Sequence, residues 1–178
     1  MDRASASEAE GCGFDSRRPH DASAEQHLRR ALELAAEAET AGDVPVGAVL
    51  VCGELVVEAK NEKELRGDPT AHAEILAIQE AARRFGGWRL IEATLYVTKE
   101  PCAMCAGAIV AARIARLVYG ASDPKAGAAG SVIDVFNSAA AHHQVQVTGG
   151  ILEQETSRQL RAFFGRRRAK TAERWSSG

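Results

Sequence analysis

Apolar residues follow a helical spacing first and a strand spacing next in the opening part of the chain. Over residues 25–40 they recur every three or four positions, and Gly42 stands just past the end, where a C-cap glycine is typical. Residues 46–52 and 55–60 are rich in β-branched side chains and flank the turn sequence Gly53-Glu54. This pattern predicts a helix followed by an antiparallel hairpin.

A polar loop over residues 61–70 separates the hairpin from the next helical pattern. The loop ends in Thr70, a residue type that favours the N-cap position, and helical spacing follows over residues 71–85. The pair Gly86-Gly87 then interrupts the pattern. We therefore expect a second helix that begins just after Thr70.

The middle of the chain predicts a strand, a helix and a second strand. The first strand ends in residues 95–98, and Pro101 opens a helix, dense in Ala and Gly, over residues 103–112. A short strand over residues 117–119 leads into a Gly-rich loop at 121–130. Because binding residues are often carried on such loops, we expect this one to be functional.

The last part of the chain predicts one more strand and one more helix. Residues 145–148 form the strand, Gly149-Gly150 interrupts it, and residues 151–168 show helical spacing. Strands separated by helices after an initial hairpin imply a mixed sheet between helical layers. The expected fold class is α/β, a three-layer α/β/α sandwich with a central mixed five-stranded sheet.

The length of 178 residues fits one domain with short additional ends. Residues 1–22 show no periodicity and are expected to form a flexible leader that leaves Cys12 exposed. Residues 23–168 are expected to hold the folded domain, and residues 169–178 a basic, disordered C-terminal tail.

Composition and charge narrow the class of protein further. Apolar residues are 46% and charged residues 26%, as in ordinary soluble proteins, and no apolar run approaches the roughly 18–20 residues that cross a membrane. The first twenty residues hold four acidic side chains and no apolar stretch, unlike secretory or transit signals. We therefore expect a cytoplasmic protein that does not associate with membranes.

The net charge of −2 hides an asymmetry between the two ends of the chain. Residues 158–178 hold seven basic side chains against one Glu, which is +6, and residues 1–157 carry −8. A basic cluster of this kind is typical of a surface that binds a polyanion, but it also suits the C-terminal end of a solvated helix. Charge alone leaves both interpretations open.

Three side chains with metal-binding chemistry are expected at helix starts. His72 falls in the first turn after Thr70, and the pair Cys102 and Cys105 falls in the first turn after Pro101. Residues three apart on a helix lie about 60° apart on one face, so both sulfurs can reach one ion. A helix N-terminus also favours the thiolate form, and in a reducing cytosol C-x-x-C is more typical of metal or redox chemistry than of a disulfide.

Two thiolates and one imidazole leave the fourth position of a tetrahedral zinc ion for water, as in catalytic zinc sites. Glu74 follows His72 by two residues, about 200° around a regular helix, so we expect it to move protons rather than to bind the ion. A lone C-x-x-C could also be a redox pair, a structural zinc knuckle or a chance pairing. The combination of His72-Ala73-Glu74 with Pro101-Cys102-x-x-Cys105 is the pattern of zinc nucleobase deaminases.

The chain resembles the bacterial tRNA-specific adenosine deaminases from about residue 24 to residue 168. Two of the matching stretches separate it from cytidine deaminases, which share only the metal signature, and the resemblance implies a cytidine deaminase-like sandwich. The matching stretches are Asp43-Val44-Pro45-Val46-Gly47-Ala48-Val49, Asp68-Pro69-Thr70-Ala71-His72-Ala73-Glu74, Glu100-Pro101-Cys102-x-Met104-Cys105-Ala106-Gly107-Ala108 and Lys125-x-Gly127-Ala128-x-Gly130-Ser131, of which the first and the last are the two discriminating ones.

This resemblance implies hydrolytic deamination of the wobble adenosine (position 34) of tRNA to inosine. One Zn²⁺ per subunit would be held by His72, Cys102 and Cys105, and hydroxide on the zinc would attack C6 of the flipped-out base. Glu74 would take the proton of the water, pass it to ring N1 and later protonate the departing ammonia. The resemblance also implies a homodimer.

The same resemblance implies which residues contact the RNA. Asn61 would hydrogen-bond the target nucleoside and Val46 would pack on its base. Asp123 and Lys125 would meet the nucleotides that flank the target. Stacking and phosphate contacts with the tRNA anticodon stem-loop would come from the C-terminal helix, through Phe164, Arg166 and Arg167.

Other interpretations of these residues stay open at this point. Asn61 could be a loop cap, and Asp123 and Lys125 could be solvated charges. The chain could also deaminate a free base or nucleoside (guanine or cytidine), or it could be an inactive, zinc-stabilised RNA-binding subunit, which would not need Glu74. Lys99 stands where relatives often have an apolar residue, and we expect it to lie away from the chemistry.

Overall fold

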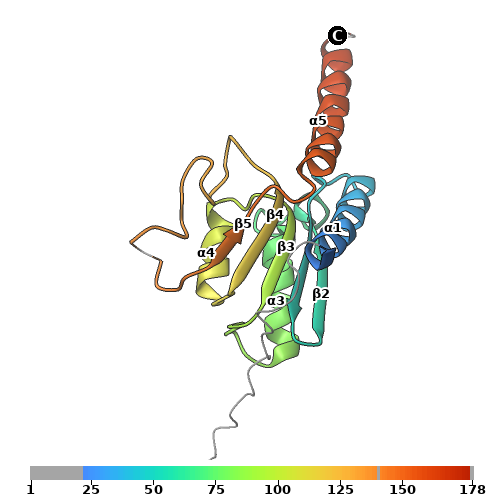
Figure 1. Ribbon diagram of the computed structural model, residues 1–178. Coiled ribbons are helices and arrows are strands. Elements are labelled where there is room, and N and C mark those ends of the chain that lie inside the picture. Colours follow the sequence, from blue (N-terminus) through green and yellow to red (C-terminus); the bar gives the residue numbers. More distant parts are fainter. Residues whose placement is uncertain (1–21, 140, 177–178) are drawn as a thin grey trace, which may run out of the picture.

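The computed structural model describes residues 22–139 and 141–176, and it contains one mixed sheet with helices on both faces (Figure 1). Cys12 and the rest of the expected leader over residues 1–21 lie outside the described part. In chain order the elements are α1 (Ala22–Thr40), β1 (Gly47–Cys52), β2 (Leu55–Lys60), α2 (Lys63–Arg66), α3 (Ala73–Phe85), β3 (Thr94–Lys99), α4 (Ala103–Ala111), β4 (Arg116–Ala121), β5 (Gln146–Thr148) and α5 (Glu153–Ser176).

The five strands lie in the order β2-β1-β3-β4-β5. β1 and β2 form the predicted antiparallel hairpin, with Gly47 opposite Lys60 and Cys52 opposite Leu55. β1 is also antiparallel to β3, whereas β3, β4 and β5 run parallel to one another. The mixed five-stranded sheet between helices confirms the expected fold class.

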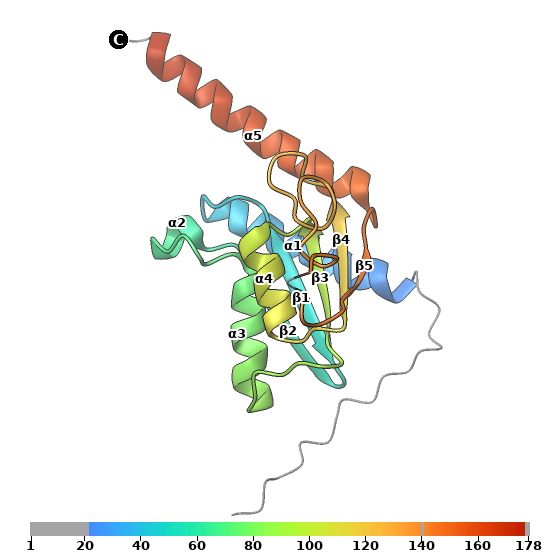
Figure 2. The ribbon, with the colours of Figure 1, turned by 90° about the vertical axis from the view of Figure 1, so that its left-hand side faces the viewer.

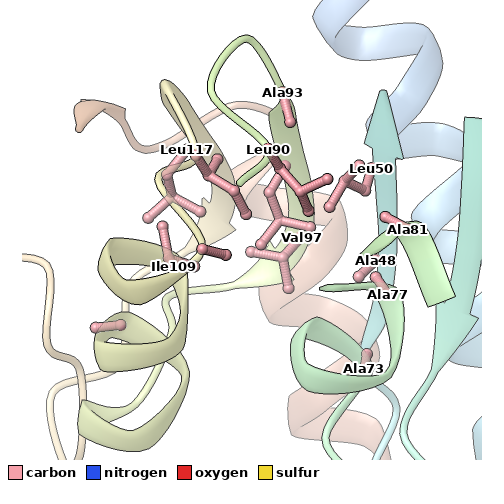
Figure 3. Close-up of a cluster of buried hydrophobic side chains, with 14 of the residues drawn as sticks. Ala48, Leu50, Ala73, Ala77, Ala81, Leu90, Ala93, Val97, Ile109 and Leu117 are labelled. Atoms are coloured by element: carbon pink, nitrogen blue, oxygen red, sulfur yellow. The ribbon is translucent and has the colours of Figure 1, made fainter. Parts of the chain in front are cut away.

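Strand residues alternate between two cores, because successive side chains on a strand point to opposite faces. Leu50, Leu95 and Leu117 pack with the buried residues of α3 and α4, and Figure 3 shows part of this cluster. Val49 and Tyr96, one position along, pack instead against α1. Each central strand is therefore buried on both sides, and the helix starts of α3 and α4 are held on one face of the sheet.

The connection between β2 and α3 differs from the expected loop. Residues 63–66 form the short helix α2, and α3 begins at Ala73 with His72, not Thr70, as its N-cap. Thr70 lies in the loop before the helix, where its backbone N–H (2.8 Å) and its hydroxyl (2.7 Å) both donate to Asp68 Oδ1. The expected helix start was therefore wrong by two residues.

The last helix also extends further than expected. α5 continues to Ser176, eight residues beyond the predicted end at Arg168, and the two views show its C-terminal half standing clear of the sheet (Figures 1 and 2). Residues 166–176 contain no Gly or Pro and are rich in Ala, Arg, Lys and Glu, which all favour helix. The expectation of a disordered tail was therefore wrong for residues 169–176.

No helix within residues 22–139 and 141–176 has both the length and the apolar character to cross a membrane.

Candidate metal site and substrate pocket

Three side chains from two helix starts converge on one point. His72 Nδ1 lies 3.8 Å from Cys102 Sγ and 3.5 Å from Cys105 Sγ, and the two sulfurs are 3.7 Å apart. Within the described residues, these three are the group of His, Cys, Asp or Glu side chains placed closely enough to hold a metal ion. The structure thus brings together the residues that the sequence predicts, across a separation of about thirty positions.

The backbone explains how each of these side chains is aimed. His72 and Cys102 are the N-cap residues of α3 and α4, with extended backbone angles (φ −75°, ψ 150° and φ −75°, ψ 173°), and neither side chain caps its own helix. Both were expected inside the first turn of their helices. Because the backbone of an N-cap residue is not helical, these two side chains can point toward each other rather than along the helix surfaces.

The two thiols influence each other strongly. Contacts with Cys105 and His72 lower the pKa of Cys102 to about 3. The Cys102 sulfur and burial together raise the pKa of Cys105 above its ordinary value. The pair therefore holds one negative charge readily, and a cation between the sulfurs would be needed to stabilise the second.

Glu74 lies beside this group without belonging to it. It stands in the first turn of α3, is only 4% exposed, and lines the same pocket as His72 and Cys102. Burial raises the pKa of Glu74 above the usual range of a carboxyl group. A carboxylate that gains a proton easily is suited to accepting and returning one.

A cavity of about 200 Å³ opens beside the metal-binding group. Its lining combines segments that are far apart in the sequence, from the connection before β1 to Phe164 of α5. The complete lining is Val44, Val46, Asn61, Lys63, His72, Glu74, Lys99, Glu100, Cys102 and Phe164.

Asn61 is a pocket residue and not only a loop cap. It is 6% exposed, and its Nδ2 donates a hydrogen bond to Asp43 Oδ1 at 2.8 Å. Its backbone N–H donates to the carbonyl of Val46 at 2.9 Å, so the two residues expected to contact the substrate lie next to each other.

Lys99 and Glu100 line the pocket although the sequence did not single them out as functional. The expectation that Lys99 lies away from the chemistry was wrong, because the last residue of β3 reaches the same cavity as Cys102. Its Nζ lies 2.6 Å from Asp123 Oδ2. A charged residue at a position where relatives often carry an apolar one was the signal that could have marked Lys99.

Asp123 and Lys125 are not part of the pocket lining. Asp123 is 7% exposed, and both of its oxygens bind within the protein, one to Lys99 Nζ and the other to the backbone N–H of Lys125 at 3.0 Å. The Lys125 residue is exposed on the surface of this loop. Asp123 therefore shapes the loop beside the pocket, and Lys125 is the member of the pair that is open to solvent.

The aromatic and basic residues of α5 have different surroundings. Phe163 is buried, and the Arg167 guanidinium lies 5.6 Å from its ring centre. Phe164 is 41% exposed and reaches the pocket. Arg166 forms an ion pair with Glu39 of α1, which fixes α5 against the first helix.

Comparison with known proteins identifies the family. A model of the MafB19-like deaminases matches residues 22–161. The chain is 49% identical over 146 residues to the tRNA-specific adenosine deaminase of Haemophilus influenzae, covering 81% of this chain and 84% of that protein. It is 46% identical over 147 residues to the tRNA-specific adenosine deaminase of Bacillus subtilis, covering 82% and 91%.

A solved structure agrees with these relatives. It comes from work on A-to-I editing by tRNA:A34 deaminases at the wobble position of transfer RNA, and it has a TM-score of 0.73 and 44% sequence identity. The match covers 76% of this chain and 99% of that chain. The chain therefore belongs to the MafB19-like deaminases and, among them, to the tRNA-specific adenosine deaminases.

Proposed function

We propose that this enzyme hydrolyses the 6-amino group of the wobble adenosine at position 34 of tRNA, producing inosine and ammonia in the cytoplasm. The observation that carries the proposal is the single pocket in which Glu74 lies beside the His72, Cys102 and Cys105 group. Relatives of the chain are named tRNA-specific adenosine deaminase, and a similar solved structure comes from work on editing at the wobble position.

The metal is Zn²⁺, one ion per subunit. With bond lengths of about 2.3 Å to sulfur and about 2.0–2.1 Å to nitrogen, tetrahedral geometry places sulfurs about 3.8 Å apart and sulfur and nitrogen about 3.5–3.6 Å apart. The distances of 3.7 Å between the sulfurs and of 3.5 and 3.8 Å to His72 Nδ1 support this assignment. When bound, zinc lowers the pKa of a water toward about 7 and so supplies a nucleophile.

Glu74 moves the protons of the reaction. Its carboxylate accepts a proton from the attacking water and delivers it to N1 of the adenine ring, which makes C6 more electrophilic. It then transfers the second proton to the amino nitrogen, so that ammonia leaves and the C6–O bond remains. The raised pKa of Glu74 suits both directions of transfer.

The remaining pocket residues hold the base. Asn61 hydrogen-bonds the nucleoside, Val46 packs on the purine face, and Phe164 stacks or closes the open side. Because the cavity of about 200 Å³ is lined by side chains from several elements, a base must leave its stack to enter it.

Residues outside the pocket bind the rest of the anticodon stem-loop. Lys125 is exposed beside the pocket, and Asp123 contributes by holding the Lys125 backbone in place. Arg166 and Arg167 lie on α5 and supply positive charge for the phosphates. We also propose that the active form is a homodimer, as the resemblance to this family implies.

The decisive experiment compares two substrates. Purified zinc-loaded protein is incubated with an anticodon stem-loop containing adenosine at position 34 and, separately, with free adenosine, and inosine is measured. We expect conversion of the stem-loop only. Equal rates on the free nucleoside would refute the RNA substrate, and conversion of guanine or cytidine instead would assign the chain to another deaminase activity.

A Glu74→Gln variant separates an enzyme from an inactive binding subunit. We expect turnover to fall by about a thousandfold or more, because proton transfer is lost while the metal ligands are intact. Zinc content measured by elemental analysis should stay near one per chain. Loss of zinc would mean that Glu74 is itself a ligand, and unchanged turnover would remove it from the mechanism.

A further inference from the structure

Asp43 is a buried carboxylate outside the pocket lining that contacts a residue of the pocket. It lies in the connection between α1 and β1 and is fully buried. Its Oδ1 accepts a hydrogen bond from Asn61 Nδ2 at 2.8 Å. The backbone N–H of Glu64 donates to both Asp43 oxygens (3.1 and 3.0 Å), and that of Leu65 donates to Oδ2 at 3.1 Å.

These contacts fix the polarity of the Asn61 amide. The oxygens of an ionised carboxylate only accept hydrogen bonds, and every partner of Asp43 is an N–H group. If the amide rotated by half a turn, Asn61 Oδ1 would face Asp43 Oδ1, and two acceptors would meet without a proton between them. Such a buried contact is strongly unfavourable, so a single amide orientation is allowed.

The backbone of Asn61 is fixed as well. Its N–H donates to the Val46 carbonyl at 2.9 Å, and the next N–H, that of Glu62, donates to the Ala71 carbonyl at 3.0 Å. Since the backbone and the amide plane are both held, the edge of Asn61 that faces the cavity is set before any substrate binds. Pre-set hydrogen-bonding groups lower the cost of orienting a bound substrate.

We propose that Asp43 is a positioning residue that acts through Asn61, holding the amide in the one orientation that receives the target nucleoside. This inference rests on the proposed function. Asp43 itself touches neither the base nor the metal-binding group, and its effect on the reaction passes through the 2.8 Å hydrogen bond to Asn61.

A double-mutant cycle tests whether Asp43 affects the reaction through Asn61. Steady-state kinetics on the stem-loop are measured for the original protein, Asp43→Asn, Asn61→Ala and the double variant. We expect Asp43→Asn to lower kcat/KM by about tenfold when Asn61 is present and by less than about twofold in the Asn61→Ala background. Equal losses in both backgrounds would mean that Asp43 supports the fold alone, and the proposal would be overturned.

Two further variants guard against loss of folding and against a general loop effect. Asp43→Glu keeps the acceptor but displaces it, so we expect a loss of about threefold, again only when Asn61 is present. If Asp43→Asn does not fold, Asp43→Glu replaces it in the double-mutant cycle. The matched control is Asp68→Asn, which removes a carboxylate that holds Thr70 in the connection between β2 and α3 that also carries Asn61, and we expect kcat/KM to stay within about twofold.

A measurement without turnover keeps this inference separate from the proposed function. In ¹⁵N-labelled protein the Asn61 side-chain amide signals are assigned by their loss in Asn61→Ala, and their hydrogen exchange is measured. We expect slow exchange that becomes at least about tenfold faster in Asp43→Asn. Fast exchange in the original protein would refute the positioning role even if the stem-loop reacts, and a failure of the stem-loop to react would refute the proposed function even if exchange is slow.

Discussion

At the scale of single residues, Glu100 organises the loop beside the pocket. It is 2% exposed and accepts hydrogen bonds from the backbone N–H groups of Asp123 (2.8 Å), Ala129 (2.9 Å) and Ser131 (3.2 Å) and from the Ser131 hydroxyl. Burial alone would raise the pKa of Glu100, but these hydrogen bonds outweigh it and lower the pKa below its ordinary value. The carboxylate form therefore holds the Gly-rich loop against the end of β3.

Replacement of Glu100 by Gln should destabilise the protein in a pH-dependent way. The amide removes one acceptor and places an N–H₂ group against donors, so the free energy of unfolding should fall by about 2 kcal/mol at pH 7. Because the folded pKa lies below the unfolded value, taken as 4.5, the carboxylate stabilises the fold above that pH, and the benefit is lost as pH falls through the folded pKa.

Urea unfolding at pH 7 and at pH 4 measures this difference. The difference in free energy of unfolding between the original protein and Glu100→Gln should be smaller at the lower pH. Glu54→Gln, in the exposed turn of the hairpin, is the matched control and should change stability by less than about 0.5 kcal/mol at either pH. A difference in free energy of unfolding that stays constant with pH would show that the folded state does not favour the carboxylate form of Glu100.

The residues of the candidate site could be predicted where their motif is local in the sequence. The C-x-x-C pair and the His-x-Glu triplet are each read within four positions, and the structure brings their side chains together. The contacts of Asp43, Lys99 and Glu100 join residues 18 to 31 positions apart. No local pattern marks such pairs, because the sheet topology determines which of them meet.

At the scale of elements, the close approach of β1 to α1 depends on Gly47. An added Cβ at this residue would collide with the carbonyl oxygen of Ala31 and lie 2.9 Å from the backbone nitrogen of Ala35. The backbone N–H of Gly47 also donates to Thr98 Oγ1 at 3.3 Å on β3. A side chain here would push the first helix off the sheet.

Gly47→Ala should therefore lower the free energy of unfolding by about 3 kcal/mol, the upper end of the usual cost of overpacking a core. Gly107→Ala is the matched control: nothing lies within 4 Å of an added Cβ at this helical glycine, so stability should rise by about 0.5–1 kcal/mol. Chemical denaturation of both variants gives the comparison. A neutral Gly47→Ala would contradict the close contact between β1 and α1.

Most elements were predicted correctly in type, and the errors concentrate at helix ends. The hairpin, the three later strands and the order of the four longer helices follow from periodicity in the sequence, whereas the short helix α2 was expected to be loop. The start of α3 could not be predicted because Thr70, whose residue type favours the N-cap, lies in the loop with a hydrogen bond to Asp68, and His72 takes the N-cap position instead. That bond depends on the course of the loop, which periodicity does not describe.

At the scale of the whole molecule, α5 packs against α1 and then extends away from the domain. Its Gln159 side chain donates to the Leu32 carbonyl of α1 at 3.2 Å, and Arg166 pairs with Glu39 further along. Beyond these contacts the helix projects from the domain (Figure 2). Arg167 and Arg168 are exposed at the start of this projection, and we propose that they meet an extended polyanion.

The double variant Arg167→Gln, Arg168→Gln should weaken binding to the anticodon stem-loop and make it less sensitive to salt. Each lost phosphate contact should reduce the slope of log Kobs against log salt concentration by about 1. Fluorescence anisotropy at several salt concentrations measures it. The pair Arg83→Gln, Arg84→Gln on α3, whose charges pair with Glu80, is the control and should leave the slope unchanged. An unchanged slope for the Arg167→Gln, Arg168→Gln variant would mean that these arginines are solvated and do not contact phosphates.

The position of Phe164 in the pocket wall has a consequence for how the enzyme matures. The metal-binding side chains and Glu74 are all present once residue 105 has been made, but the aromatic wall belongs to the final helix. At about 5–20 residues per second, the roughly sixty residues between Cys105 and Phe164 take several seconds to synthesise. During that interval the nascent polypeptide lacks the Phe164 side of the pocket, so the complete lining for a base forms only after α5 has been made.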